Sequence, residues 1–384
     1  MANPLTVSPD VLIWARESAL ASLQDAADRV AKDQDTIRKW EAGDERPTFA
    51  QLERLADEYG VSTNVLLLPT RPDVPDPPPD FRAAGNGREP LSRQARRELR
   101  RARQLQSLAA ELRLLRPFSV PPFDDPAQAV EAARALLGID IGTQLSWRNA
   151  NSAFNAWRQS LDDAGLLVLQ YGLPDEGLRG LSLAGDAGRP PVVLVNQSDW
   201  INSRIFTLLH ELGHMFFGQN GAICDPWRRL ADGHAIEAVC NRFAGAVLVP
   251  GDHLRSQAEA AAISRQGDVA EVIALLGALA NRYRVSSQVI WYRIRDLGLV
   301  SDTTFNALWP LLRPPLKRKW TKTTEDDKGG IPRWRLAPSR FGPRLVGAVM
   351  ESVAHGRLDS TRAMRAFGLG TADLAQLQTP STSA

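Results

Sequence analysis

The chain has 384 residues, of which 43% are hydrophobic and 23% charged, and its formal net charge is only +2. This length predicts two or three domains, and this composition excludes a disordered or fibrous protein. Two cysteines, Cys224 and Cys240, are too few for a disulfide framework. The sequence shows neither a leader pattern nor an apolar stretch of about 18 residues, so we expect a cytoplasmic protein without a membrane partner.

Residues 1–69 contain five short runs in which apolar residues recur at helical spacing. Ser22 and Thr48 precede two of these runs as N-cap residues, and Gly43 and Gly60 follow two of them. Five short helices in fewer than 70 residues predict a helix–turn–helix domain.

Residues 70–80 are rich in proline, which disfavours helix and predicts a stiff extended linker. Residues 81–120 form an arginine-rich connector, in which ten arginines and three glutamates lie between Arg82 and Arg116. Leucines keep a helical period through this connector, so we expect a basic amphipathic helix. Its charge run fits a solvated face as well as a contact with nucleic acid or a partner.

Residues 121–250 mix helical and strand patterns and predict an α+β domain. Helical patterns cover about 151–164, 203–217 and 234–248, and three strand patterns cover Leu166–Tyr171, Leu178–Ala184 and Pro191–Asn196. Residues 251–384 form a helical C-terminal region to which the sequence assigns no role. The predicted fold is therefore α+β and mostly helical, with a small sheet packed on the helix at 203–217.

The helix predicted at 203–217 carries the segment His210-Glu211-Leu212-Gly213-His214. Residues four apart share a helix face, so both imidazoles can reach one metal ion. Glu211 lies beside them and can take a proton from a metal-activated water. Two histidines and a glutamate in so apolar a helix need a polar purpose, because unpaired polar groups in a core are costly. The pattern predicts a Zn²⁺ site with Glu211 as the catalytic base.

A catalytic zinc site normally has a third protein ligand. The downstream candidates are Asp225, Asp232, His234 and Glu237, and the chemistry leaves the choice open. Glu237 differs from the others because it lies in the first turns of an apolar helix. Asn241, one turn further on, could hold the carboxylate of Glu237 or support a histidine ligand.

The segment around His210, followed by Glu237-Ala-Val-Cys-Asn241-Arg-Phe-Ala244, resembles the ImmA/IrrE family of zinc metallo-endopeptidases. The resemblance implies a zincin-like domain of the gluzincin type, in which His210, His214 and Glu237 bind zinc and Glu211 is the base. It also implies a small sheet before the active helix, to whose edge an extended substrate could add.

The first 69 residues resemble the XRE (Cro/phage repressor) family, through Trp14-Ala-Arg16-Glu17, Trp40-Glu41-Ala-Gly43 and the run from Pro47 to Ala56. In that family the second helix of the motif enters the major groove of DNA, which here would present Gln34, Thr36, Arg38 and Lys39. The sequence departs from the family in its tight turn, Ala31-Lys32-Asp33, where glycine is common. Asp33 and Asp35 also bring negative charge to the expected phosphate side.

Together these resemblances imply a regulatory zinc endopeptidase that cleaves a transcriptional repressor or a related protein and thereby controls gene expression. DNA is an expected partner through the first domain, and a homodimer is one expected oligomeric state. The alternative is a DNA-binding transcription regulator, or an antitoxin-like protein, whose peptidase domain is sensory or inactive. A structural zinc site with a fourth protein ligand, His234 or Asp232, is a further alternative.

Overall fold

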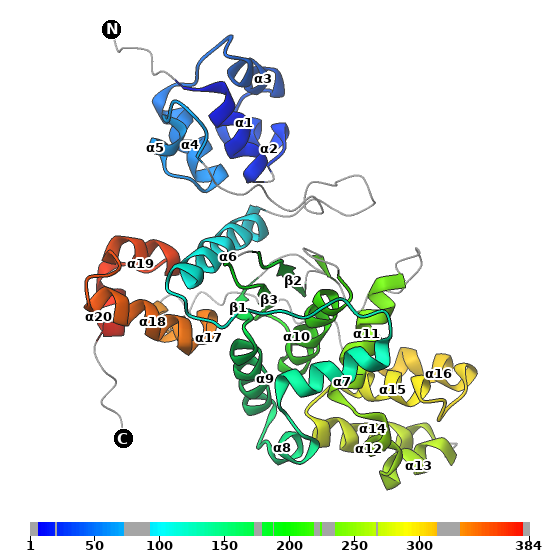
Figure 1. Ribbon diagram of the computed structural model, residues 1–384. Helices are drawn as coiled ribbons and strands as arrows, with labels where there is room; N and C mark the ends of the chain where they lie inside the picture. Colours follow the sequence, from blue (N-terminus) through cyan, green and yellow to red (C-terminus); the bar gives the residue numbers. More distant parts are fainter. Residues whose placement is uncertain are drawn as a thin grey trace. The chain divides into compact units, whose positions relative to one another are not determined.

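The computed structural model describes residues 7–19, 21–72, 93–172, 179–186, 188–218, 223–224, 235–265, 268–312 and 331–378. The chain divides into two compact units, with the division between Gln104 and Leu105. Helices dominate both units, and one small sheet lies in the second (Figure 1). The predicted α+β, mostly helical fold is confirmed.

The first unit begins with the five predicted helices. Ser22 and Thr48 each form a capping box, in which the side chain accepts from the backbone N–H three residues on. The helices bury Ile37, Trp40 and Tyr59 in a core of their own. The elements are α1 (Pro9–Ser18), α2 (Leu23–Val30), α3 (Gln34–Ala42), α4 (Phe49–Tyr59) and α5 (Thr63–Leu66).

Helix α6 (Arg93–Glu111) begins in the first unit and ends in the second. Within the first unit, Arg96 is 4% exposed and pairs with Glu58 at 3.2 Å and with Asp25 at 3.1 Å. Arg100 donates to the carbonyls of Ala19 and Glu58, and burial lowers its pKa to about 10. These arginines of the connector are therefore internal. Most of the predicted proline-rich linker lies outside the described residues.

The second unit contains a four-stranded sheet with the strand order β1-β3-β2-β4. β3 pairs in parallel with β1, whereas β2 pairs antiparallel with both β3 and β4. The three strands predicted from the sequence are confirmed, and β4 is a short addition. The strands are β1 (Leu167–Tyr171), β2 (Gly180–Leu183), β3 (Val192–Asn196) and β4 (Ile223–Cys224).

Helices cover the sheet and continue to the end of the described chain. They are α7 (Pro126–Leu137), α8 (Ile141–Ser146), α9 (Ala150–Ala164), α10 (Ile201–Phe216), α11 (Ala235–Leu248), α12 (Gly251–Arg255), α13 (Ala258–Arg265), α14 (Val269–Tyr283), α15 (Ser287–Asp296), α16 (Asp302–Leu308), the 3-10 helix η2 (Trp309–Leu312), α17 (Arg333–Phe341), α18 (Pro343–Ala354), α19 (Ser360–Phe367) and α20 (Thr371–Gln378). Arg284 adopts a left-handed conformation at the end of α14 and separates this helix from α15.

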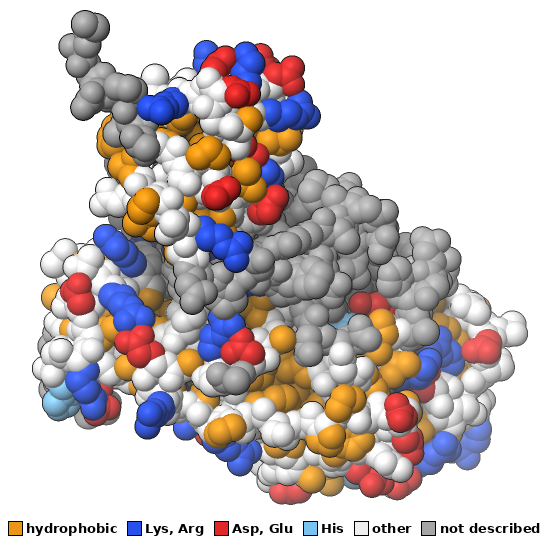
Figure 2. Space-filling view, turned by 45° about the horizontal axis from the view of Figure 1, so that its top comes forward, with side chains coloured by type: hydrophobic (Ala, Val, Ile, Leu, Met, Phe, Trp, Pro, Cys, Tyr) orange, Lys and Arg blue, Asp and Glu red, His pale blue; other side chains and the backbone are white. Residues whose placement is uncertain are grey.

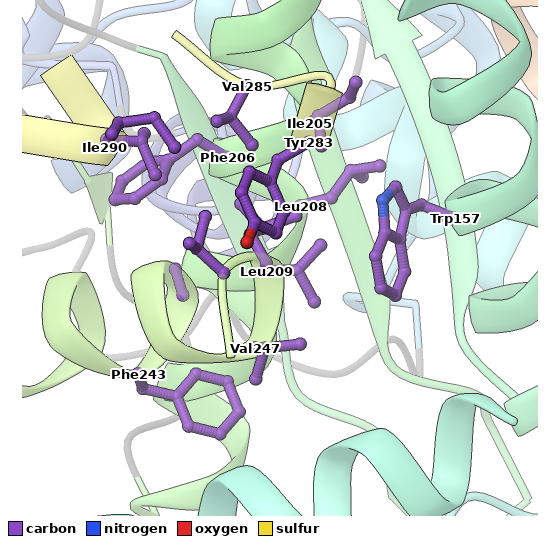
Figure 3. Close-up of a cluster of buried hydrophobic side chains, with 14 of the residues drawn as sticks. Trp157, Ile205, Phe206, Leu208, Leu209, Phe243, Val247, Tyr283, Val285 and Ile290 are labelled. Carbon is purple, nitrogen blue, oxygen red and sulfur yellow. The ribbon is translucent and has the colours of Figure 1, made fainter. Parts of the chain in front are cut away.

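The main core of the second unit surrounds α10. Ile205, Leu208 and Leu209 of this helix are fully buried, with Trp157 of α9 and Val247 of α11 among their core neighbours (Figure 3). Val168 of β1 and Val193 and Val195 of β3 face this core, because successive side chains of a strand point to opposite faces. Residues before and after position 250 belong to this same core. The domain boundary that the sequence predicts at 250 stays a prediction.

Helix α17 lies against β1, the strand at one end of the sheet order. The Ser339 carbonyl near the end of this helix accepts from Gln170 of β1 at 2.7 Å and from Arg158 of α9 at 2.6 Å. Carbonyls at a helix end lack intrahelical partners, so these bonds satisfy one of them and attach the C-terminal helices to the sheet. No helix among the described residues is long and apolar enough to cross a membrane.

Candidate metal centre

Helix α10 carries the two histidines one turn apart on a buried face. His210 is fully buried, His214 is 1% exposed, and Glu211 between them is fully buried. The helix forms because apolar residues surround the motif on both sides, which gives it a core to pack into on most of its circumference. The sequence therefore places three polar side chains inside an apolar environment, and their positions are fixed by packing.

Three side chains from α10 and α11 lie close enough together to bind one metal ion. The Nε2 atoms of His210 and His214 lie 3.1 Å apart. Glu237 of α11 brings Oε2 to 3.3 Å from Nε2 of His210 and Oε1 to 3.7 Å from Nε2 of His214. A tetrahedral zinc site with bonds of about 2.0–2.2 Å spaces its ligand atoms roughly 3.3–3.6 Å apart. Two imidazole nitrogens and one carboxylate at these distances fit Zn²⁺.

Glu211 packs against the first residue of strand β2. A Cβ atom placed on Gly180 would lie 3.1 Å from Oε1 of Glu211 and 2.4 Å from Cγ2 of Thr207. Thr207 precedes Glu211 by one helical turn, so it shares the same face of α10, and it is fully buried. The absence of a side chain at Gly180 therefore gives the carboxylate of Glu211 its place beside the sheet.

The segment before Gly180 is tied to the loop that leads into α10. Arg179 pairs with the buried carboxylate of Asp199 at 2.8 Å, and its carbonyl accepts from the backbone N–H of Asn196 at 2.8 Å. Asp199 lies two residues before the first residue of α10. The start of β2 and the start of the active helix are thus held together on either side of the site.

A second glycine sets the distance between α10 and α11. A Cβ atom on Gly213 would lie 3.0 Å from Cδ1 of Phe243 and 3.4 Å from the Cα atom of Cys240. This close approach lets Glu237, one turn before Cys240, reach the two histidines. Burial raises the pKa of the Cys240 thiol well above its ordinary value, with a smaller contribution from Glu237 and Glu211. Among the described residues, the group that could hold a metal ion is His210, His214 and Glu237, without Cys240.

The structure brings together three of the predicted site residues, His210, His214 and Glu237, and Glu211 follows His210 directly on the same buried helix. Asn241 follows Glu237 by one turn of α11, and its supporting role stays a prediction. The other candidate ligands, Asp225, Asp232 and His234, lie outside the described residues. The sequence does not single out Gly180, Thr207 or Gly213, because the need for a glycine comes from the residues that pack against it, which lie elsewhere in the sequence. Only Gly213 has a signal in the sequence, since it lies inside the segment from His210 to His214.

The four residues predicted to face DNA lie on α3 and all have partners within the first unit. Asp33 accepts from Thr36, and Gln34 donates to Gln24 at 2.6 Å. Arg38 pairs with Asp35 at 2.6 Å, and Lys39 pairs with Glu45 at 2.8 Å. Hydrogen bonds from Thr36 hold the pKa of Asp33 below its usual range. Residues 7–72 contain twelve acidic and eight basic side chains. The pairs of Arg38 and Lys39 are about half exposed or more, so a DNA phosphate can replace either carboxylate.

Comparison with protein families assigns the two parts of the chain. Residues 161–295 match the peptidase M78 family model, described as the IrrE N-terminal-like domain. Residues 12–66 match a helix-turn-helix model. Both resemblances drawn from the sequence are confirmed in their predicted order, and the second match supports DNA binding by the first unit. No curated protein and no solved structure gives a significant match.

Proposed function

We propose that the chain is a regulatory zinc-dependent endopeptidase that cleaves a transcriptional repressor or a related protein. The observation that carries this proposal is the convergence of His210, His214 and Glu237, with Glu211 buried next to His210 on the same helix. The matches to a peptidase domain and to a helix–turn–helix domain support a regulator that carries a peptidase.

In this proposal His210, His214 and Glu237 would hold one zinc ion. Bound zinc supplies Lewis-acid activation of a water molecule and of the scissile carbonyl. Glu211 takes the proton of the attacking water and later delivers it to the leaving amine. Its burial against Gly180 and Thr207 fixes the carboxylate in one position, and positioning of this kind contributes strongly to the rate.

The small sheet offers a place for an extended substrate, because a peptide can add to a free strand edge. Strand β4 already pairs with Gly180 and Leu181 of β2. On this side of the sheet we therefore expect a substrate peptide to pair with Ser182 and Leu183, the residues of β2 that β4 does not pair with. On the opposite side of the sheet, α17 lies against β1.

Two variants separate this function from its alternatives. Glu211→Gln keeps the three zinc ligands, so it should retain zinc, measured by plasma emission of the purified protein, and lose cleavage. His210→Ala should lose zinc and cleavage together. Mass spectrometry of new N-termini, in cells that co-express candidate repressors with each variant, would identify the cut site and the substrate.

The outcomes distinguish a catalytic site from a sensory or structural one. If cleavage and the transcriptional response both survive Glu211→Gln, the chain is not a peptidase with this base. If the response survives His210→Ala with zinc lost, the metal centre has no role in regulation. A metal-bound structure with four protein ligands would favour the structural site.

A further inference from the structure

The last two helices of the described chain, α19 and α20, match α2 and α3 of the first unit in length and in the turn that joins them. Helix α2 has eight residues, and three residues, Ala31 to Asp33, separate it from α3. Helix α19 also has eight residues, and three residues, Gly368 to Gly370, separate it from α20. Two helices joined by a turn of three or four residues, often with a glycine, are characteristic of this motif.

The backbone of the two turns follows the same hydrogen-bond pattern. In the first, Ala31 is left-handed with a φ of 54°, and the N–H of Lys32 donates to the carbonyl five residues before it at 3.0 Å. In the second, Gly368 is left-handed with a φ of 64°, and the N–H of Leu369 donates to the carbonyl five residues before it at 2.9 Å. Glycine adopts this conformation without the cost that Ala31 carries.

The buried residues of the two motifs fall at the same spacing. Ala26, Val30 and Ile37 are at most 3% exposed in the first motif. Adding 337 to each number gives Ala363, Phe367 and Leu374, which are at most 4% exposed. Helix α18 packs against both α19 and α20 and completes a three-helix unit. Helix α20 also packs against α17.

The exposed residues differ in charge between the two motifs. Asp25 and Asp28 of α2 correspond to Arg362 and Arg365 of α19. In contrast, Arg38 and Lys39 of α3 correspond to Ala375 and Gln376 of α20, so the basic side chains of the second motif lie on its first helix. Residues 331–378 contain seven arginines and three acidic side chains. Basic side chains are visible at the end of the second unit that carries these helices, on the left of Figure 2.

The basic side chains of this unit are accessible to a polyanion. Arg365 is exposed, and the described residues place no carboxylate within ion-pair distance of it. Arg362 pairs with Glu111 and Arg357 pairs with Glu351, but all four side chains are about half exposed or more. Exposed pairs of this kind contribute little stability, so phosphate groups can replace the carboxylates.

From these observations we propose that α18–α20 form a second helix–turn–helix unit that binds duplex DNA, with α20 in the major groove. Thr371, Ala372 and Gln376 form the exposed face of α20 and are suited to base edges, since alanine contacts the thymine methyl group and glutamine pairs with adenine. Arg362 and Arg365 on α19 contact phosphates and set the position of the unit. The proposal does not depend on the peptidase activity.

The test uses the full chain with both α3 side chains reversed, Arg38→Glu/Lys39→Glu, so that the first motif does not mask the second. Fluorescence anisotropy measures binding to a random-sequence duplex of roughly 25 base pairs between 50 and 200 mM salt. Adding Ala372→Glu/Gln376→Glu should weaken binding at least tenfold. Adding Arg365→Glu should weaken it and reduce the slope of log affinity against log salt by about 1.

A matched charge reversal gives the control. Arg265→Glu changes an exposed arginine of α13, outside the proposed unit, and should leave binding and salt slope unchanged. Circular dichroism of each variant must show the helix content of the parent. The proposal is wrong if duplex binding is absent from the α3 variant, if the α20 changes leave it intact, or if the unit binds only single-stranded nucleic acid or protein.

Discussion

Gly180→Ala should slow cleavage about 100-fold and leave zinc binding intact. The added Cβ atom would lie 2.4 Å from Cγ2 of Thr207. Two carbon atoms in contact are separated by about 3.5–4.0 Å, so β2 and α10 must move apart by roughly 1.1–1.6 Å at this point. Forcing an extra methyl group into a packed core costs about 1–3 kcal/mol of unfolding free energy, which urea titration would measure.

The displacement falls on the catalytic base and spares the metal ligands. Glu211 has its Oε1 atom 3.1 Å from the new Cβ, whereas the close contacts of that atom include no zinc ligand. A misplacement of about 1 Å costs on the order of 100-fold in rate. We therefore expect kcat for the identified substrate to fall about 100-fold, with the zinc content unchanged.

A second substitution tests whether the clash is the cause. Thr207→Ser removes the Cγ2 methyl group and keeps the hydroxyl, so the double variant Gly180→Ala/Thr207→Ser should recover much of the lost activity. Gly277→Ala in α14 is the matched control, because nothing lies within 4 Å of its added Cβ and helix propensity favours alanine. Full activity in Gly180→Ala, or no recovery in the double variant, would refute the reasoning.

Three further changes address other parts of the structure. Gly213→Ala should weaken zinc affinity at least tenfold, because its Cβ would lie 3.0 Å from Phe243 and push α11 away from α10. Competition with a chelator measures this affinity, and an unchanged value would contradict the prediction. Burial raises the pKa of Asp162 to about 6, so protonation of this group stabilises the fold below about pH 4, and that stability is lost as pH rises through 6. Asp162→Asn should therefore gain about 2–3 kcal/mol relative to wild type in urea titrations between pH 4 and pH 7, and a pH-independent difference would refute the assignment. Ala31→Gly should raise the thermal midpoint of the first unit by relieving about 1 kcal/mol of strain at a φ of 54°, whereas Ala50→Gly in α4 should lower it; equal effects would exclude strain.

The sequence predicted those parts of the fold that leave a periodic signal. The face shared by His210 and His214 follows from four-residue spacing on a helix, and the three main strands follow from short apolar runs between turn residues. Glu237 was chosen among four candidates by its position in an apolar helix and by resemblance. The structure places it against both histidines.

Contacts between segments that are far apart in the sequence leave no periodic pattern, so they could not be predicted from the sequence. Nothing near Gly180 in the sequence indicates that Thr207 and Glu211 lie against it, because the contact joins a strand to a helix that begins 21 residues later. The arginines of α6 gave a charge pattern without an indication of their partners. Arg96 proved to be buried against Glu58, which is separated from it by 38 residues.

The contact between Arg96 and Glu58 has a consequence for how the chain can be divided. A fragment that ends at Pro72 would lack α6 and leave the buried Glu58 carboxylate without this arginine, a loss that typically costs several kcal/mol. A specific protease site engineered between Pro72 and Arg93 should therefore give two pieces that co-elute from a sizing column. In the cleaved protein, the two pieces would stay associated without the covalent connection through the proline-rich segment, because α6 would hold the N-terminal piece.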